Sequence, residues 1–507
     1  MGPGTPSKRQ LFIAAASVSA LLVSRSALAD FNVVGADIPE LENAYATDET
    51  TVTDVVQQYL NRIAEYNLPN AGGINAVFEV NPNILSEAEA EDTMIADGAT
   101  EAQYPLLGVP VLVKGSYDVA GLITDNGVSI LAGGEGSNTP GETTLIPTTN
   151  AFSVQQLIDA GALIIGKSNM STMAYSYDGI DNAGGAVVNP FNPLRIPGGS
   201  SSGIGAGISA NFAMLGMGGE TGGSIRVPSD ADGDVGLKTS AGLIDPGGTW
   251  PLTPSRDVVG PIAKDVTDIA YAMNALVAPS PTNLWNNTPY YPTSEPGSVR
   301  PADYTSFLQT TALEGKVIAV PNSMTGVGTQ YEGTESPVVL AAFNNALTVM
   351  QNEGATIVHV NIPASVLYYS TIGSSGAGTP ATTTGFPYPY PTTTVGGTVP
   401  ATAWSNDAAA YYYEKQIESY HDPVIQNLQD FANALQAGAN LGAGSPFSTL
   451  KSAASNIKSL AAIYEAGQAA GFESTNGVPD NPNAIEALQG LTDLRNAGIN
   501  DFMADPG

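Results

Sequence analysis

Residues 197–228 read PGGSSSGIGAGISANFAMLGMGGETGGSIRVP, where two Gly/Ser-rich motifs, GGSSSG (198–203) and ETGGSIR (220–226), flank a stretch of small apolar residues. Such a pattern is compatible with a linker, a phosphate-binding loop or two parts of a catalytic site. A P-loop requires GxxxxGK(S/T), which the chain lacks, and the GxGxxG pattern fails because Ile208 stands where its last glycine should be. Phosphate binding is therefore disfavoured.

The first motif also contains GSSSG (199–203), which fits the G-x-S-x-G motif of α/β-hydrolases with Ser201 at its centre. That fold requires an acid and then a histidine after the serine, and only His359 and His421 are available. The sequence ATIVHVNI predicts a strand around His359, and ESYHDP predicts a helix end at His421. The preceding FNPLRIPGG does not predict a buried strand, so a Ser–His–Asp site is disfavoured.

A lysine can replace the histidine as the base that activates a serine. Lys114 ends the apolar run GVPVLVKG, and Lys167 lies in the similar run LIIGKSN. Burial disfavours the ammonium form and lowers the pKa of a lysine, as a base requires. The residues alone leave both lysines open as the base, and for either one a solvated or ion-paired side chain is the alternative.

The second motif supplies groups that acyl chemistry needs. ETGGSIR places consecutive main-chain N–H groups at 221–224, and the two glycines let the backbone fold around a developing oxyanion. Ser224 would then stand beside its own oxyanion hole. The alternative is a tight turn before a strand.

Composition excludes several classes of function. The chain has 507 residues with 48 acidic and 17 basic ones, no cysteine, two histidines and a net charge of −31. A basic surface is needed to bind nucleic acid, and anionic membranes are disfavoured for the same reason. Without cysteine and with two histidines, we expect neither a disulfide nor a metal site. We expect no cofactor and no nucleic-acid partner, and the sequence leaves the oligomeric state open.

The N-terminus has the pattern of a secretory signal. Lys8 and Arg9 precede an apolar run over 11–23, and Ala27-Leu28-Ala29 follows as an A-x-A cleavage site. The run is shorter than the roughly 20 residues that span a membrane, so a membrane anchor is the disfavoured alternative. We expect residues 1–29 to be a cleaved signal peptide and the mature protein to be periplasmic or extracellular.

Hydrophobic periodicity predicts an α/β fold. The pattern predicts a helix over 51–66, a buried strand ending near Lys114, and a helix followed by a buried strand over 152–170. A further strand, helix and strand are expected over 313–363. Such units form a mostly parallel or mixed sheet with helices on its faces.

Two segments are rich in Pro, Thr and aromatic residues, about 281–305 and about 372–405. They could be linkers between domains. Because the α/β pattern resumes without a change of composition, we interpret them as insertions in one domain that form a lid or a cleft wall.

The motifs in order, NPFNPLRIPGGSSSG, ETGGSIRVPS and GDVGLKTSAGLI, resemble the amidase signature family. GVPVLVKG resembles the lysine-bearing strand of that family, LIDAGALIIGKSNMSTMAY its adjacent helix and strand, and DVVGPIAKDVTDIAYAMNAL the helix after the signature. AAAYYYEKQIESYH resembles a later helix more loosely. The likeness covers about 50–280. It implies one large α/β domain over 30–507, with a mixed sheet between helices.

The resemblance implies a Ser–Ser–Lys triad. Ser224 would be the nucleophile, Ser200 the relay hydroxyl with a cis peptide bond before it, and Lys114 the base, whereas Lys167 would have a supporting place. Thr221, Gly222, Gly223 and Ala174 would bind the oxyanion and substrate, and Ser201, Glu220 and Arg226 would support the site. The implied reaction is amide hydrolysis through an acyl-enzyme, without a metal or a cofactor.

The chain departs from the family pattern at three positions. Ser202 replaces a glycine, Glu220 replaces an aspartate, and Gly115-Ser116 replaces the usual Asp-Asn after the base. The chain also stops at INDFMADPG, where relatives usually continue with further strands. We expect a truncated sequence or a lost C-terminal part.

Together with the signal pattern, the resemblance implies an exported amide hydrolase, and analogy with exported relatives makes primary amides or amidated peptides the first expected substrates. Aryl or fatty amides and esters are alternative substrates. Alternative functions are a non-catalytic scaffold that retains the fold and a component of a transfer-RNA amidotransferase. Lys114, Ser200 and Ser224 are all present, which favours an enzyme over a scaffold. Export, acidity and the aromatic insertions disfavour the amidotransferase.

Overall fold

The computed structural model describes residues 31–68, 72–133, 143–240, 242–253, 256–277, 301, 303–322, 336–360, 410, 413–440, 445–469, 474–475 and 478–479. Contacts divide the chain into two compact units. Unit 1 comprises 1–302 and 403–484, and unit 2 comprises 303–402 and 485–507. The single domain over 30–507 stays a prediction.

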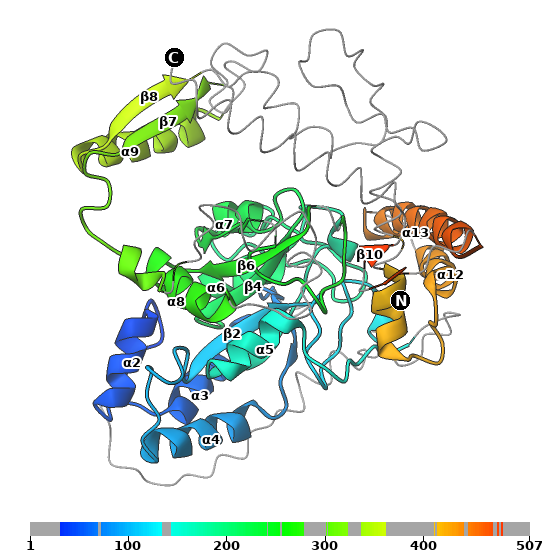
Figure 1. The fold of residues 1–507 in the computed structure, drawn as a ribbon, viewed down its shortest axis with the longest axis horizontal. Helices are drawn as coiled ribbons and strands as arrows, with labels where there is room; N and C mark the ends of the chain where they lie inside the picture. The colour runs from blue at the N-terminus through cyan, green and yellow to red at the C-terminus, as the bar shows by residue number, and fades with distance from the viewer. Residues whose placement is uncertain are drawn as a thin grey trace. The chain divides into compact units, whose positions relative to one another are not determined.

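A six-stranded mixed sheet forms the core of unit 1 (Figure 1), in the order β1-β3-β2-β4-β6-β5. The strands are β1 (Val77–Val80), β2 (Val109–Lys114), β3 (Ala162–Ser168), β4 (Leu215–Glu220), β5 (Val235–Gly236) and β6 (Val258–Ala263). The central pairs β3–β2 and β2–β4 are parallel, and the outer pairs are antiparallel. Every residue of β2, β3 and β6 is buried, as expected for strands covered on both faces. The predicted strand ending at Lys114 is confirmed.

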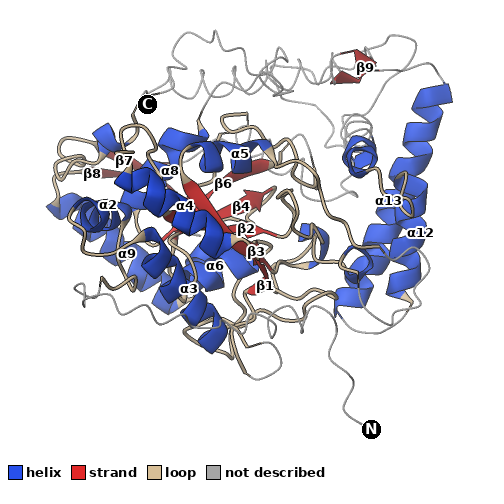
Figure 2. Ribbon diagram, turned by 90° about the horizontal axis from the view of Figure 1, so that it is seen from below, coloured by secondary structure: helices blue, strands red, loops and turns tan. Residues whose placement is uncertain are grey.

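Helices enclose this sheet on both sides (Figure 2). They are α2 (Ile38–Ala46), α3 (Val52–Tyr66), α4 (Ile84–Ala96), α5 (Phe152–Asp159), α6 (Ser202–Ser209), α7 (Arg226–Asp232) and α8 (Val266–Leu276), with 3-10 turns η1 (Ser129–Leu131) and η2 (Thr172–Ala174). The helix predicted over 51–66 is α3, and the Thr51 hydroxyl caps it by accepting from the Asp54 N–H at 3.1 Å. The expected α/β class with a mixed sheet is confirmed.

The strand register places the two candidate lysines on opposite faces of the sheet. Val113 of β2 pairs with Lys167 of β3, and Lys114 pairs with Ser168. Paired residues share a face, and successive residues alternate between faces. Lys114 and Lys167 therefore cannot serve the same side of the sheet.

The C-terminal part of unit 1 is helical. A helix over 413–420 precedes α12 (Leu428–Ala439) and α13 (Ser445–Ala469), and the short strands β9 (Ser474–Thr475) and β10 (Val478–Pro479) pair antiparallel. Trp250 belongs to the apolar cluster that these helices bury. Its ring lies 5.1 Å from that of Phe431, 6.0 Å from that of Tyr420 and 6.1 Å from that of Tyr413, measured between centroids. These aromatic contacts fix the position of Trp250.

Unit 2 contains the predicted strand, helix and strand. β7 (Val317–Pro321) pairs parallel with β8 (Thr356–Val360), and α9 (Pro337–Asn352) connects them after the 3-10 turn η3 (Thr305–Phe307). His359 lies on β8 as expected, and His421 of unit 1 directly follows the helix over 413–420. Within unit 1, His421 is not among the described residues that line the cavity of the candidate site.

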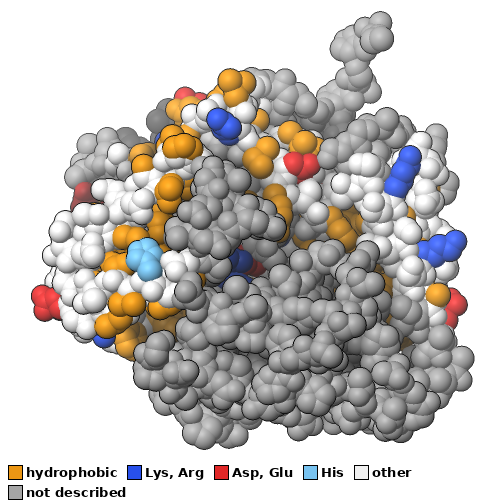
Figure 3. Space-filling model, turned by 90° about the horizontal axis from the view of Figure 1, so that it is seen from above, with side chains coloured by type: hydrophobic (Ala, Val, Ile, Leu, Met, Phe, Trp, Pro, Cys, Tyr) orange, Lys and Arg blue, Asp and Glu red, His pale blue; other side chains and the backbone are white. Residues whose placement is uncertain are grey.

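Three predictions concern residues outside the described ones: the signal peptide over 1–29 and nearly all of the insertions at about 281–305 and 372–405. Among the described residues, no helix is both long and apolar enough to cross a membrane. On the face shown in Figure 3, the described lysines and arginines are scattered and do not gather into a patch.

Asp232 gives a testable feature of this fold. Its carboxyl is fully buried on α7 without a hydrogen-bond partner among the described residues. Burial, with a smaller contribution from Asp234, raises the pKa of Asp232 to about 9. The folded protein therefore keeps the Asp232 proton up to about pH 9, whereas the unfolded chain releases it near pH 4. Because the folded state binds more protons between these two pH values, the unfolding free energy falls as pH rises from about 4 to about 9.

Replacing Asp232 with asparagine is expected to raise the unfolding free energy by about 1–3 kcal/mol at pH 8 and by less at pH 5. Urea unfolding at the two pH values measures this. Asp230→Asn, at an exposed position of the same helix, is the control. An equal gain at both pH values would contradict the buried titration.

Candidate active site

Lys114 is the buried cation of the site. It ends β2 with 2% of its surface exposed, and its Nζ lies 2.8 Å from Ser200 Oγ and 3.3 Å from the Gly219 carbonyl oxygen. Burial lowers the pKa of Lys114 to about 7, although the negative charges of Asp257 and Glu220 oppose the shift. Near neutral pH, a large fraction of this amine is therefore free to accept a proton.

Ser200 and Ser201 connect the lysine to the second motif. The Gly199–Ser200 peptide bond is cis, as the resemblance implies, and the Ser200 side chain is fully buried. The Ser201 hydroxyl lies 3.3 Å from both main-chain polar atoms of Gly219, and the Ser201 N–H donates to the Ser224 carbonyl at 3.3 Å. The two Gly/Ser motifs thus lie side by side, next to the lysine.

The turn 221–224 presents unused hydrogen-bond donors. The main-chain N–H groups of Thr221, Gly222, Gly223 and Ser224 donate to no other residue that the structure describes. Gly223 has φ of +142°, a conformation that a residue with a side chain rarely adopts. Consecutive free N–H groups can hold a negatively charged oxygen, which is the requirement for an oxyanion hole.

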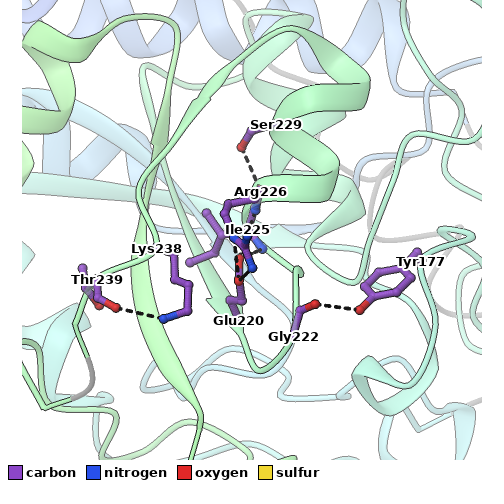
Figure 4. A network of polar contacts seen from close by, with 8 residues as sticks. All are labelled: Tyr177, Glu220, Gly222, Ile225, Arg226, Ser229, Lys238 and Thr239. Carbon is purple, nitrogen blue, oxygen red and sulfur yellow. Dashed lines mark hydrogen bonds and ion pairs between the residues drawn. The ribbon is translucent and has the colours of Figure 1, made fainter. Parts of the chain in front are cut away.

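Glu220 and Tyr177 hold this turn in place (Figure 4). One carboxylate oxygen of Glu220 accepts from the N–H groups of Ile225 and Arg226, each at 3.1 Å, and the other binds the Arg226 guanidinium at 2.5 and 2.9 Å. Tyr177 approaches from a separate loop and donates its hydroxyl to the Gly222 carbonyl at 2.9 Å. Glu220, which precedes the turn, therefore ties the start of the turn to the residues that follow it. An aspartate has one methylene fewer and could make these contacts only if the backbone shifted.

A cavity of about 140 Å³ opens beside Lys114. Its wall includes Thr221 of the turn, and Met173, Trp250, Pro251 and Leu252 make one side apolar. Three acidic residues also line it, Glu220, Asp245 and Asp257, whereas Lys114 is the only basic residue among the described lining. The cavity therefore suits a neutral or cationic ligand with an apolar portion.

Lys167 has a different environment from Lys114. Its Nζ donates to the Tyr117 carbonyl oxygen and lies 3.5 Å from Thr124 Oγ1. Burial lowers the pKa of Lys167 to about 8, opposed by the charges of Asp118, Asp125 and Glu79. This lysine holds together the loop that follows β2, which agrees with a supporting place.

The remaining predicted residues take varied places. Ala174 lines the cavity, but its own N–H donates to the Ser171 carbonyl at 2.9 Å, so it offers a surface rather than a donor. Of the three departures, Ser116 lines the cavity, whereas Ser202 is buried at the start of α6. Within the described residues, no group of three or more acidic or histidine side chains could hold a metal ion.

Sequence reasoning missed several residues of this site. Asp257 accepts hydrogen bonds from Thr221 Oγ1 and from the N–H groups of Leu252 and Thr253, which ties the turn to the cavity wall. Gln416 and Trp250 also line the cavity. No local motif marks these positions, because each is defined by partners that lie far away in the chain.

This arrangement of an α/β fold, a buried lysine against a serine and a glycine-rich turn with free N–H groups is typical of serine hydrolases that use lysine in place of histidine. The family model described as Amidase matches residues 54–381. The chain therefore belongs to the amidase family.

Two kinds of relatives are similar to it. A glutamyl-tRNA(Gln) amidotransferase subunit of Caldanaerobacter subterraneus subsp. tengcongensis is 30% identical over 326 residues, 64% of this chain and 60% of that protein. The corresponding protein of Geobacter sulfurreducens is 33% identical over 325 residues. The native peptide amidase of Stenotrophomonas maltophilia has a TM-score of 0.65 with 25% identity, covering 90% of this chain and 79% of that one. The match spans about 60% of the length of these curated relatives.

The lowered pKa of Lys114 predicts an acid limb in the pH profile. If neutral Lys114 is the base, kcat/KM for amide hydrolysis should fall about tenfold per pH unit below a pKa of about 7 and level off above it. Rates in a constant-ionic-strength buffer series measure this, with circular dichroism to show that the fold persists. A flat profile over that range, with the fold intact, would contradict a neutral lysine base.

Proposed function

We propose that this chain is an exported amide hydrolase that cleaves primary amides or amidated peptides through an acyl-enzyme on Ser224. The observation that carries the proposal is the 2.8 Å contact between Lys114 Nζ and Ser200 Oγ, at a site where the backbone of Ser201 binds that of Ser224. A buried amine, the hydroxyl in contact with it and the main chain of a second serine thereby lie in one part of the fold.

The chemistry follows from these groups. Neutral Lys114 takes the Ser200 hydroxyl proton while Ser200 takes that of Ser224, whose oxygen attacks the amide carbonyl carbon. The carbonyl oxygen becomes an oxyanion held by the free N–H groups of 221–224. The proton returns to the departing nitrogen, the C–N bond breaks, and ammonia or an amine leaves. Water, deprotonated by the same relay, then attacks the carbonyl carbon of the acyl-enzyme. The bond between that carbon and Ser224 Oγ breaks, the carboxylic acid leaves, and the relay returns the proton to Ser224.

The charge of the cavity favours a substrate that lacks a carboxylate. Lys114 is the only basic residue among its described lining, against three acidic ones. Glutamine is a zwitterion: these acids would attract its α-ammonium but repel its α-carboxylate, for which the described lining offers only Lys114 as a cation. An amidated peptide end is neutral, and similarity to the structure of a peptide amidase supports the same substrate class.

The leaving group that is released distinguishes the candidate functions: ammonia from the amino-acid amide, the fatty amide and glutamine, an arylamine from the anilide, and an alcohol from the ester. The panel comprises an acetylated amino-acid amide, a fatty amide, an anilide, an ester and free glutamine, each tested with wild type and Ser224→Ala. Ser224-dependent turnover of the amino-acid amide supports the proposal. Preference for glutamine would support the amidotransferase, and preference for the fatty amide, anilide or ester would support the other hydrolases. A folded but inert protein would support a scaffold.

Export is part of this proposal and rests on the signal pattern of residues 1–29. Expression in a Gram-negative host, followed by fractionation and N-terminal sequencing, tests it. A periplasmic or secreted product beginning at Asp30 is expected. A cytoplasmic product that retains Lys8 and Arg9 would refute it.

A further inference from the structure

Gln416 places an amide group at the wall of the cavity that contains Lys114. It lies on the helix over 413–420, half-buried, and belongs to the cavity lining. Its nearest partners are Asp118, which follows β2, and Tyr420, one helical turn further along. These three side chains join segments about 300 positions apart, since Gln416 and Asp118 are separated by 298 residues.

Hydrogen-bond accounting fixes the orientation of the Gln416 amide. Nε2 donates to Asp118 Oδ2 at 2.9 Å and to Tyr420 Oη at 2.9 Å, while the Tyr420 hydroxyl donates to Asp118 Oδ1 at 2.6 Å. A carboxylate only accepts, so the NH₂ side of the amide must face Asp118. Both Nε2 hydrogens are thereby used, and the one group left over is the acceptor Oε1.

The support under Gln416 is rigid. Asp118 is 5% exposed, and its main chain donates to the Gly248 carbonyl at 2.9 Å and accepts from the Ala151 N–H at 2.8 Å. Tyr420 stacks on Trp250 with an interplanar angle of 20°. Gln416 Oε1 has no hydrogen-bond partner among the residues that the structure describes. On a residue that lines a cavity, a fixed acceptor without a partner can act as a specificity element, because a ligand that lacks a donor leaves it unpaired.

We propose that Gln416 Oε1 accepts a hydrogen bond from an N–H group of the substrate, and that this contact selects acylated amino-acid amides over amides with no N–H beside the scissile carbonyl. This inference rests on the proposed amide hydrolysis and names its substrate class. Asp118 and Tyr420 act as positioning residues for Gln416. The acidic lining of the cavity agrees with a donor-bearing, uncharged or cationic substrate.

A pair of substrates isolates this contact. N-acetyl-leucinamide carries the N–H, and its counterpart O-acetyl-2-hydroxy-4-methylpentanamide replaces that N–H with an ester oxygen of nearly the same shape. Ammonia release reports cleavage of the terminal amide in both. We expect wild type to prefer the N–H substrate by about 10–100-fold in kcat/KM. This is the usual cost of leaving an acceptor without a hydrogen bond, as Gln416 Oε1 would be with the ester substrate.

Gln416→Met removes the acceptor and keeps the length of the side chain. The preference is expected to fall to about 1–3-fold, because kcat/KM falls for the N–H substrate and stays unchanged for the ester substrate. Gln416→Asn, which retracts the amide by one methylene, should also lower the preference. Gln436→Met is the matched control, an exposed glutamine on α12 outside the cavity lining, and should keep the wild-type ratio.

Two outcomes would overturn the inference, and they are distinguishable. Ser224-dependent turnover with the same substrate ratio in wild type and Gln416→Met would refute the role of Gln416 and leave the proposed hydrolysis standing. Absence of Ser224-dependent turnover of either amide by folded wild type would refute both. Thermal unfolding of each variant verifies that a changed ratio does not come from partial unfolding.

Discussion

Ser224→Ala is expected to lower kcat for amide hydrolysis by about 10⁴–10⁶-fold, the range found when the nucleophile of a serine hydrolase is removed. The reason is chemical: without the hydroxyl oxygen no acyl-enzyme forms, and only binding and the oxyanion hole remain. The fold should persist, because the contact of residue 224 with Ser201 uses its main-chain carbonyl, which alanine keeps.

Ser153→Ala provides the control for this substitution. Ser153 is a buried serine on α5 whose hydroxyl has no hydrogen-bond partner among the described residues, so its removal breaks no described contact. Steady-state ammonia release and labelling by a fluorophosphonate probe measure the effect. Wild type and Ser153→Ala should be active and labelled at Ser224. Retention of more than about a tenth of the activity by Ser224→Ala would reject Ser224 as the nucleophile.

Lys114→Met is expected to lower kcat by about 10²–10⁴-fold, the usual contribution of a general base. Methionine keeps the length of the side chain but cannot take a proton from Ser200. Lys114→Arg separates the role of a base from that of a positive charge, because arginine stays protonated with a pKa above about 12. Both variants should show this loss of kcat if Lys114 acts as a neutral base.

Lys264→Met is the matched control for the lysine variants. Lys264 is half-buried, follows β6 and donates to the Ser209 carbonyl at 3.3 Å, outside the cavity lining. Burial also lowers the pKa of Lys264, so the control is likewise a lysine with a lowered pKa, but it makes no contact with Ser200. Its activity should match that of wild type. Substantial activity in Lys114→Arg would show that a positive charge, and not proton transfer, is what the site needs.

The sequence predicted the local structure well where hydrophobic pattern and glycine placement are strong. The apolar runs that end at Lys114 and precede Ser168 are the buried central strands β2 and β3, and the amphipathic pattern over 51–66 is α3. Burial on both faces of a strand demands an uninterrupted apolar run, and this leaves a clear signal in the sequence. The sequence was less informative about the segment after Ser224. A strand after the turn was one interpretation of that segment, and the structure has the short helix α7 there.

The choice between two lysines shows the limit of local reasoning. Lys114 and Lys167 have similar flanking residues, and the resemblance rather than the residues assigned the base. The register of β2 against β3 separates them, because it turns the two side chains to opposite faces. A difference of one position in register would place both lysines on the same face, and no property of either strand alone specifies the register.

By itself the sequence determined the α/β class, the buried strands, and the lysine and serine motifs, because these follow from periodicity, backbone freedom at glycine and the chemistry of single side chains. Only the tertiary structure decided what surrounds them. The 2.8 Å contact of Lys114 with Ser200, the clamp of Asp257 on Thr221 and the placement of Gln416 against Asp118 join distant segments. Such contacts depend on how helices and strands pack, and packing is a property of the whole folded chain.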